Sequence, residues 1–395
     1  WRVWPLGLLR RPGIIRLMDD ASTNKQDAGP IRVCFVAPKT YPLLNRSVEG
    51  VFGGAEVDLV LLGTALAEDG GFCVSFVSGD YGQPAREQRG AVTVLKGVRP
   101  GQSGLAGALR LWRAMKRAQA DVYMLEAASP GVPLAAAFCR RHRRALVYRT
   151  AHRDECDGTY RRAHPVWGRA FAWGLRRAAA VLAQNEDDAR LLRQTVGVTA
   201  QVIRNAHPLG PLEPQAPRDI ILWAGRSAGF KRPRRFLDLA RRFPDERFVM
   251  ICQRATGDER YEALQARAEA VGNVQFIPRV PFHEMGAYFG RARVFVNTSD
   301  AEGFPNTFVQ AATAGAAILS YTVNPDGFLT AFSCGIDCGG HFDRMVQGLR
   351  FLLDQDRYVE IGLNARRYAE EHHDMAKVVE QYKALFRGLV ERDLG

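Results

Sequence analysis

The stretch "RVFVNTSDAEGFPNTFVQAATAGAAILSY" (residues 293–321) contains a run of β-forming residues, a glycine–aromatic–proline turn, a helical segment and a second apolar run. This order predicts two parallel strands joined by a crossover helix. Gly303 permits a tight turn, Pro305 presets φ for the start of a helix, and Asn306 is expected to cap that helix. The stretch therefore predicts an α/β fold with a sharp elbow after one of its strands.

The elbow also carries polar groups suited to a ligand. A helix N-terminus offers free backbone N–H groups and the positive end of the helix dipole, which favour phosphate or hydroxyl oxygens. Glu302 precedes the turn, and Gln310 falls on the second turn of the predicted helix. The two side chains can therefore reach different parts of one extended ligand. The alternative is a loop carboxylate and a helix-face amide with structural roles alone.

Strand-like runs continue along the chain in two series. The first series comprises "IRVCFVAP" (31–38), "FCVSFVSG" (72–79), "DVYMLEAA" (121–128), "ALVYRTAH" (145–152), "AAVLAQN" (179–185) and "AQVIRN" (200–205). The second comprises "DIILWAGR" (219–226), "RFVMICQ" (247–253), "NVQFIPRV" (273–280), "RVFVNTS" (293–299) and "AAILSY" (316–321). Helical segments alternate with these runs, which predicts parallel sheets covered by helices on both faces. We expect two tandem doubly wound, Rossmann-like domains that face each other across a cleft.

Composition sets the boundaries of these domains. Four prolines in the eleven residues "HPLGPLEPQAP" predict a linker at 207–217. We expect an N-terminal domain at 30–206, a C-terminal domain at 218–355, and terminal helices at 356–395. Residues 1–29 are apolar and basic but broken by proline and glycine, and we interpret them as a poorly ordered leader. No segment approaches the roughly 18 uninterrupted apolar residues that a spanning helix requires.

The seven cysteines are odd in number and lack C-x-x-C spacing, which argues against a disulfide framework or a structural zinc site. Cys334 and Cys338 could approach a metal from one helical face, but no partner ligands lie near them in the sequence. We therefore expect reduced thiols, a cytoplasmic protein and no metal.

Positive charge is concentrated in the first domain. The 395-residue chain has a formal net charge of +12, and residues 86–177 contain 19 Lys and Arg against 6 Asp and Glu, a balance of +13. Such segregation predicts an anionic partner, either a membrane surface or a phosphate-bearing acceptor. No nucleic-acid recognition module accompanies the charge, so we expect no nucleic acid. In residues 161–179, Trp167, Phe171 and Trp173 could lie on a membrane surface or pack inward.

Polar residues follow several predicted strands. Arg226 and Lys231 lie five positions apart, between the first strand of the second domain and a helix that begins near Pro233. A guanidinium and an ammonium group at one strand end suit a diphosphate. In the first domain, Gly53 and Gly54 precede a helix, where their amides could approach a ligand closely.

The histidine of "ALVYRTAH", His152, would enter the same cleft as a hydrogen-bonding group. A lone histidine is more often a structural group. Its position at a strand end, facing the residues of the second domain, favours a functional role.

From about Ile31 to the C-terminus, these features resemble a retaining glycosyltransferase of family 4, which has the GT-B fold. The resemblance rests on the Glu302-Gly-Phe-Pro motif, where the family has E-x7-E, and on the spacing from Gly225-Arg226 to Lys231. Gly53-Gly54 and His152 add weaker support. Asn205 matches an asparagine near the end of the family's first domain.

The resemblance implies roles for these positions. Arg226 and Lys231 would hold the diphosphate of a nucleoside-diphosphate sugar, and His152 would lie near the sugar and the acceptor. Glu302 and the turn after it would contact the transferred sugar. The donor-binding residues implied in this way are Gly53, Gly54, Gly225, Arg226, Lys231, Glu302, Gly303, Phe304, Pro305, Asn306 and Gln310. We expect His152, Arg226, Lys231 and Glu302 to take part in catalysis.

Gln310 departs from the family, which carries a second glutamate there. A neutral amide can still bind a ribose diol, at a cost of about 1 kcal/mol. The substitution therefore bears on the choice of donor more than on activity.

The sequence thus predicts retaining transfer of a sugar to a glycan, a lipid-linked molecule or another acceptor, in surface polysaccharide or glycolipid biosynthesis. The enzyme would need no metal or other cofactor and could sit peripherally on the inner face of the membrane. Two alternatives stay open. The chain could bind sugar nucleotides without turnover, or it could be an epimerase that uses Glu56 and Glu302 as acid and base.

Overall fold

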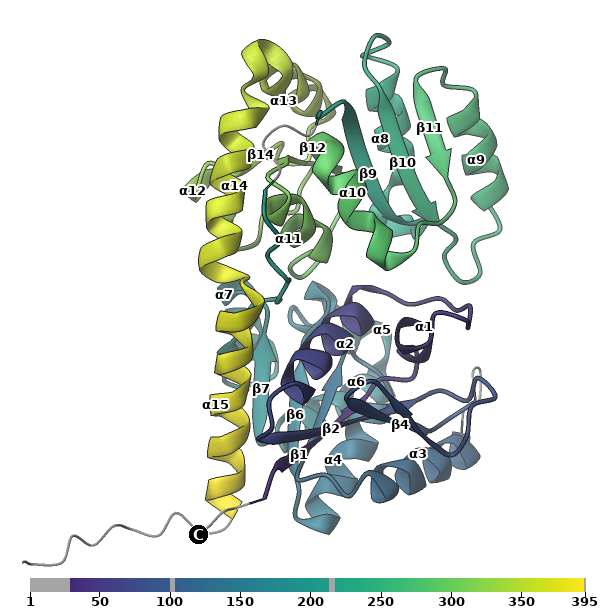
Figure 1. Ribbon diagram of the computed structural model, residues 1–395, viewed down its shortest axis with the longest axis vertical. Helices are drawn as coiled ribbons and strands as arrows, with labels where there is room; N and C mark the ends of the chain where they lie inside the picture. The colour runs from purple at the N-terminus through teal and green to yellow at the C-terminus, as the bar shows by residue number, and fades with distance from the viewer. Residues whose placement is uncertain (1–28, 100–103, 213–216, 394–395) are drawn as a thin grey trace, which may run out of the picture.

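The computed structural model of the protein describes residues 29–99, 104–212 and 217–393, which form two α/β domains stacked along the long axis of the molecule (Figure 1). The predicted leader lies outside the described residues except for Gly29. Within the predicted linker, residues 208–212 form neither helix nor strand, and residues 213–216 lie outside the described part.

The first domain is built on a sheet that has eight strands within the described residues, in the order β3-β4-β2-β1-β5-β6-β7-β8. The strands are β1 Ile31–Val36, β2 Phe72–Ser78, β3 Arg86–Arg89, β4 Val92–Lys96, β5 Val122–Glu126, β6 Ala145–Arg149, β7 Ala180–Ala183 and β8 Gln201–Val202. Adjacent strands are parallel except β3 and β4, which form an antiparallel hairpin at the sheet edge. Neither strand of this hairpin was predicted from the sequence, and β3, "REQR", has no apolar side chain to mark it as a strand.

Helices cover both faces of the first sheet. They are α1 Tyr41–Leu44, α2 Gly54–Ala67, α3 Gly104–Ala118, α4 Gly131–His142, α5 Thr159–Ala163, α6 Pro165–Leu175 and α7 Glu186–Thr195, with a 3-10 turn η1 at Arg153–Glu155. One face packs against α3, α4 and α6, and the other against α2 and the C-terminal helix α15 (Met375–Asp393).

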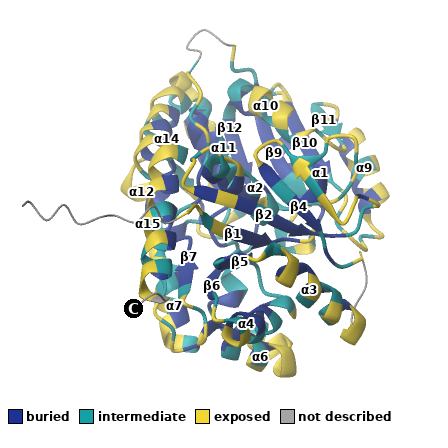
Figure 2. Ribbon diagram, turned by 60° about the horizontal axis from the view of Figure 1, so that its bottom comes forward, coloured by how far each residue is buried: buried dark blue, intermediate teal, exposed yellow. Residues whose placement is uncertain are grey.

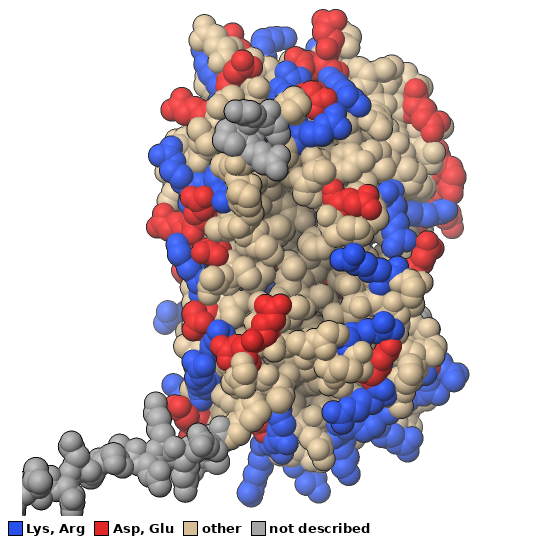
Figure 3. Space-filling view, viewed as in Figure 1, with Lys and Arg blue, Asp and Glu red and all other residues tan. Residues whose placement is uncertain are grey.

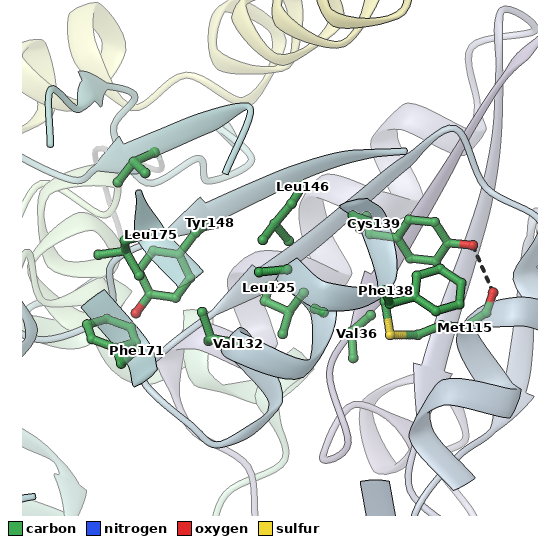
Figure 4. Packing of buried hydrophobic residues seen from close by; sticks show 14 of the residues in the cluster. Val36, Met115, Leu125, Val132, Phe138, Cys139, Leu146, Tyr148, Phe171 and Leu175 are labelled. Atoms are coloured by element: carbon green, nitrogen blue, oxygen red, sulfur yellow. Dashed lines mark hydrogen bonds between the residues drawn. The ribbon is translucent and has the colours of Figure 1, made fainter. Parts of the chain in front are cut away.

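The core beneath α3, α4 and α6 is rich in aromatic side chains (Figure 4). Phe171 of α6 meets Tyr148 of β6 edge to face at 5.3 Å, and Phe138 of α4 meets Tyr123 of β5 at 5.2 Å. These large buried rings fix the helices on the sheet, which in turn fixes the loops at the strand ends.

The second domain has, within the described residues, a six-stranded parallel sheet of order β11-β10-β9-β12-β13-β14. Its strands are β9 Ile220–Arg226, β10 Phe248–Gln253, β11 Val274–Ile277, β12 Ala292–Asn297, β13 Ala317–Ser320 and β14 Gly335–Asp337. Its helices are α8 Pro233–Ala240, α9 Tyr261–Glu269, α10 Met285–Arg291, α11 Asn306–Thr313, α12 Phe328–Ala331, α13 Phe342–Leu353 and α14 Tyr358–His372. Short 3-10 turns are η2 Gly229–Lys231, η3 Phe282–Glu284, η4 Pro325–Gly327 and η5 Asp354–Asp356.

Cys334 and Cys338 do not share a helical face. The two cysteines flank the short edge strand β14, and both are buried. Burial raises the pKa of each thiol to about 12, so both are neutral packing groups.

Helices α14 and α15 run one after the other down one side of the molecule (Figure 1). Tyr382 and Phe386 of α15 are buried against the first domain, where Phe386 meets Phe72 at 6.5 Å. The C-terminal helices thus cross from the second domain to the first. In the described part of the chain, no helix combines the length and apolar character needed to span a bilayer.

Candidate active site

A cleft of about 470 Å³ is lined by residues of both domains, beyond the carboxyl ends of their strands. Its lining includes every site residue predicted from the sequence: Gly53, Gly54, His152, Gly225, Arg226, Lys231, Glu302, Gly303, Phe304, Pro305, Asn306 and Gln310. The two sheets explain this convergence, since parallel strands deliver their following loops to one edge.

Lys231 and Glu302 form an ion pair on the second-domain wall. Lys231 ends η2, after β9, and its Nζ lies 2.5 Å from Oε2 of Glu302. The other carboxylate oxygen, Oε1, accepts hydrogen bonds from Ser299 Oγ at 2.6 Å and Asn297 Nδ2 at 3.0 Å. Burial alone would raise the pKa of Glu302, but the Lys231 charge and these hydrogen bonds hold that pKa below its ordinary value. Glu302 is therefore an anion, fixed in position, at neutral pH.

Arg226, the last residue of β9, differs from Lys231 in its contacts. It is half-buried in the cleft, and among the described residues its guanidinium has neither a hydrogen bond nor an ion pair. A Cβ atom built on Gly53 would lie 3.6 Å from Nη2 of Arg226. The guanidinium therefore lies beside the N-terminus of α2, with its donors available to an anion.

The elbow after β12 contacts the first domain. The Phe304 amide donates to Gln184 Oε1 at 2.9 Å, and a Cβ on Gly303 would meet that oxygen at 3.1 Å and the Ala151 carbonyl at 3.2 Å. Residue 303 must therefore be very small for the elbow to approach so closely.

The predicted helix cap at Asn306 is wrong. The N-cap position of α11 is Pro305, and Asn306 is the first helical residue. Its side chain instead donates to the Gly54 carbonyl at 2.9 Å, across the cleft. A polar side chain at the start of a helix can form a hydrogen bond with another domain instead of capping its own helix. The local sequence does not reveal such a distant partner.

His152 lies three residues beyond the end of β6, so the strand is shorter than predicted. Its Nδ1 accepts a hydrogen bond from the Asp154 amide at 3.2 Å, which in the neutral ring assigns the hydrogen to Nε2. Nε2 is buried and has no partner among the described residues, and the ring meets Phe230 edge to face at 5.3 Å. The first-domain wall thus offers one free N–H donor.

A buried ionic cluster, absent from the sequence-based expectations, lies behind this wall. Arg149 Nη1 donates to Asp58 at 3.0 Å and to Glu126 Oε1 at 2.7 Å. Burial raises the pKa of both carboxyl groups, against the opposing effect of Arg149. Two carboxyl groups thus share one guanidinium.

Oε2 of Glu126 is buried, lacks a hydrogen-bond partner within the described residues, and belongs to a side chain that lines the cleft. Glu155, another buried carboxyl group of the lining, has both oxygens bonded, to the Ala128 amide, the Ala151 amide and Tyr148 Oη. Glu126 therefore presents to the cleft one carboxyl oxygen, Oε2, that has no partner within the described residues. Its signal in the sequence was an acidic residue at the end of a buried strand.

Asn205 connects this cluster to the elbow. Its Oδ1 accepts from Arg149 Nη2 at 2.8 Å, and its Nδ2 donates to the Phe304 carbonyl at 3.0 Å and to Asn306 Oδ1. The backbone carbonyl of Asn205 accepts from the His373 ring at 2.8 Å. A continuous chain of hydrogen bonds therefore links the two domains behind the cleft.

Gln310 faces the cleft from α11, on the second turn of the helix as predicted. The lining around the second sheet also contains residues that were not predicted from the sequence, among them Gln253, Arg279, Val280, Phe282 and Met285. Gln253 is the last residue of β10, and the other four follow β11, so the rule that polar residues gather at strand ends could have found Gln253 and Arg279. Among the described residues, no group of three or more His, Cys, Asp or Glu side chains could hold a metal ion.

Comparisons with known families match most of the chain. Residues 52–209 match the model described as Glycosyltransferase Family 4, and residues 218–336 match the model described as Glycosyl transferases group 1. Over 152 residues, 37% of the chain, the sequence is 30% identical to the Vi polysaccharide biosynthesis protein VipC/TviE of Salmonella typhi. The matched part spans only 23% of that curated relative.

Solved structures share the architecture. Sucrose-phosphate synthase from Thermosynechococcus elongatus superposes with a TM-score of 0.76 at 15% identity, over 92% of this chain and 100% of that one. A trehalose-6-phosphate protein from E. coli, bound with UDP-2-fluoro glucose, superposes with a TM-score of 0.65 at 12% identity, over 90% and 98% of the two chains.

Proposed function

The chain is a glycosyltransferase with the GT-B fold, similar to family 4, and from this premise we propose that it transfers a sugar from a nucleoside-diphosphate donor with retention of anomeric configuration. The observation that carries the proposal is the meeting of Arg226, Lys231 and Glu302 around one cleft between the domains. Arg226 and Lys231 would hold the diphosphate, and Glu302 with the elbow would hold the sugar.

The transfer would need no protein nucleophile. The bond between the anomeric carbon and the phosphate oxygen breaks, a bond to the acceptor oxygen forms on the same face, and the departing phosphate takes the acceptor proton. Arg226, Lys231 and the start of α11 would stabilise the charge that develops on the phosphate. The absence of a metal requirement stays a prediction, and addition of EDTA tests it.

We place the acceptor on the first-domain wall. Two buried polar atoms without protein partners support this side, His152 Nε2 and Glu126 Oε2. A hydroxyl group both donates and accepts hydrogen bonds, so a polyhydroxylated acceptor could satisfy both atoms. The hydrogen-bond chain through Asn205 would close the domains around the two substrates and exclude water.

The epimerase alternative is less favourable in this geometry. Glu302 is bonded to Lys231, Ser299 and Asn297, and Glu56 accepts from the Gly53 amide at 2.7 Å within a helix cap. Both oxygens of Glu302 are therefore occupied, and one oxygen of Glu56 is engaged in the helix cap, which disfavours proton exchange with a substrate carbon. A binding protein without turnover is excluded if the purified protein transfers or hydrolyses a donor.

The test is a thermal-shift screen against UDP, GDP and their sugar conjugates, followed by an assay of nucleotide release. We expect one nucleoside diphosphate to raise the melting temperature and its sugar conjugate to be consumed. Melting temperatures that no nucleotide changes would contradict the proposal. The relative in Vi polysaccharide biosynthesis supports a glycan or lipid-linked acceptor in surface polysaccharide or glycolipid assembly.

We also propose that the enzyme works in the cytoplasm, peripherally at an anionic membrane surface. The support is the excess positive charge of residues 86–177, together with the polymer chemistry named for the relative. Flotation with anionic and with neutral vesicles tests this proposal, and equal recovery with both would contradict it.

A further inference from the structure

Much of the positive charge of the first domain lies on α3, α4, α5 and α6, on one side of its sheet, where α7 adds three acidic and two basic residues. Helices α3, α4, α5 and α6 carry four, two, two and one Lys or Arg respectively, and none of these helices contains Asp or Glu. On the opposite side, α2 contains acidic residues and α15 alternates acidic with basic ones. Figure 2 shows α3, α4 and α6 together in one layer, with exposed outer surfaces.

Six cations of this layer define what we call the basic face: Arg110, Arg113, Lys116, Arg117, Arg140 and Arg141. Within the part of the chain that the structure describes, none of the six forms an ion pair. Lys and Arg side chains also gather along the lower edge of the molecule in Figure 3, around α3. Unneutralised cations at this density favour an extended anionic partner over isolated surface ion pairs.

A hollow of about 640 Å³ opens on the basic face. Its lining contains Lys96, four cations of α3 and Gln119, with no carboxylate. A hollow of this composition suits a phosphate group.

Apolar side chains project from the same helix. Leu105 is 78% exposed and Leu109 is 48% exposed, one turn apart on α3. Lys116 and Arg113 continue the same exposed stripe, while Leu111 and Met115 on the opposite side of the helix are buried. A helix whose exposed stripe combines leucines with cations is typical of segments that lie in the interface of a bilayer.

The stretch predicted for membrane contact, residues 161–179, makes a smaller contribution. Phe171 is buried in the core and Trp173 is half-buried, so these rings pack inward. Trp167 of α6 is 52% exposed and Val166 is 74% exposed, in the same helical layer as α3. The layer therefore has exposed apolar groups on two of its helices.

We infer that the basic face docks on an anionic phospholipid bilayer, with Leu105 and Leu109 in the headgroup region and the cations over the lipid phosphates. This inference deepens the proposed membrane function and rests on it. The exposed leucines favour a bilayer over a soluble polyanion, which would contact the cations alone.

The test is flotation of the full chain with vesicles of phosphatidylcholine, alone or containing about one third phosphatidylglycerol. The variant Arg113→Glu with Lys116→Glu reverses two charges on the face. Its control, Arg234→Glu with Arg242→Glu, makes the same change of net charge at exposed positions of the second domain. We expect wild type and control to float only with the anionic vesicles, and the face variant to lose at least tenfold in bound fraction.

The outcomes separate the two proposals. A wild-type protein that floats with neither vesicle would contradict the membrane function itself. A face variant that still floats as wild type does would overturn the assignment of the face, as would an equal loss in the control. Leu105→Ser with Leu109→Ser should lower the bound fraction severalfold, and unchanged binding would contradict the placement of the two leucines in the headgroup region. Circular dichroism of each variant verifies that it is folded.

Discussion

Nζ of Lys231 lies 2.5 Å from Oε2 of Glu302, while Arg226 in the same cleft has no protein partner among the described residues. Lys231 is thus held in place by an ion pair within the protein, whereas the donors of Arg226 are available to an anion. Two substitutions should separate these roles.

Lys231→Met should impair both stability and turnover. It leaves Glu302 buried without its cation, which costs on the order of 3 kcal/mol in the free energy of unfolding. It also removes a charge that would stabilise the leaving diphosphate, so kcat should fall by about 10²-fold or more. Guanidinium unfolding and nucleotide release measure the two effects. Lys377→Met, at an exposed position of α15, is the control, and wild-type turnover in Lys231→Met would refute the assignment.

Arg226→Gln should impair binding without loss of stability. Among the described residues the guanidinium forms no hydrogen bond or ion pair that the folded protein would lose, so the melting temperature should stay within about 2 °C of wild type. A lost charge-assisted interaction of about 1.5–3 kcal/mol would weaken nucleoside-diphosphate binding by roughly 10- to 100-fold. Isothermal titration measures the affinity. Unchanged affinity would mean that the diphosphate lies elsewhere.

Glu126→Leu and Glu126→Gln should raise the KM for the acceptor by different amounts. The leucine variant removes the hydrogen-bonding atom from the cleft, whereas the glutamine variant keeps a polar atom there. With a donor and acceptor that wild type uses, we expect Glu126→Leu to raise the acceptor KM by about tenfold or more and Glu126→Gln by less. Hydrolysis of the donor by water should change little in either variant. An increase in donor KM instead would assign Glu126 to the transferred sugar.

His373 should make stability depend on pH. Burial, together with the charges of Arg204, His372 and His207, lowers its pKa from 6.5 to about 3 in the folded protein. Because the unfolded chain binds a proton at higher pH, this contribution is complete above pH 6.5 and is lost as pH falls toward 3. From pH 7 to pH 5, the free energy of unfolding should fall by about 2 kcal/mol from this group. In His373→Gln the free energy of unfolding should fall by less over that range. A fall equal to that of wild type would exclude this role of His373.

The sequence predicted the fold well because its strands are short apolar runs bounded by polar turns, and β1, β9 and β12 all lie where such runs occur. Because parallel strands deliver their loops to one edge, polar residues after the strands, such as Arg226 and Lys231, were found without coordinates. The β3–β4 hairpin was not predicted: its outer strand β3 is polar, whereas β4, "VTVLK", has the apolar character of a strand and could have been found.

Contacts between distant residues were not predictable in the same way. Asn306 looks like a helix cap in its local sequence, but its partner, Gly54, is 252 positions away. Glu126 resembles any acidic strand end until Arg149 and Gln184 are seen to occupy one of its oxygens and leave the other free. The positive charge of residues 86–177 was evident, but its restriction to one helical layer depends on how α2 and α15 cover the opposite face.

The most direct test of the central claim is proton NMR of the first product formed by wild type and by Arg226→Gln with Lys231→Met. We expect wild type to convert an α-linked nucleoside-diphosphate sugar into an α-linked product, and the double variant to form none at a measurable rate. A β-linked first product, or undiminished transfer by the double variant, would contradict retaining chemistry at this cleft.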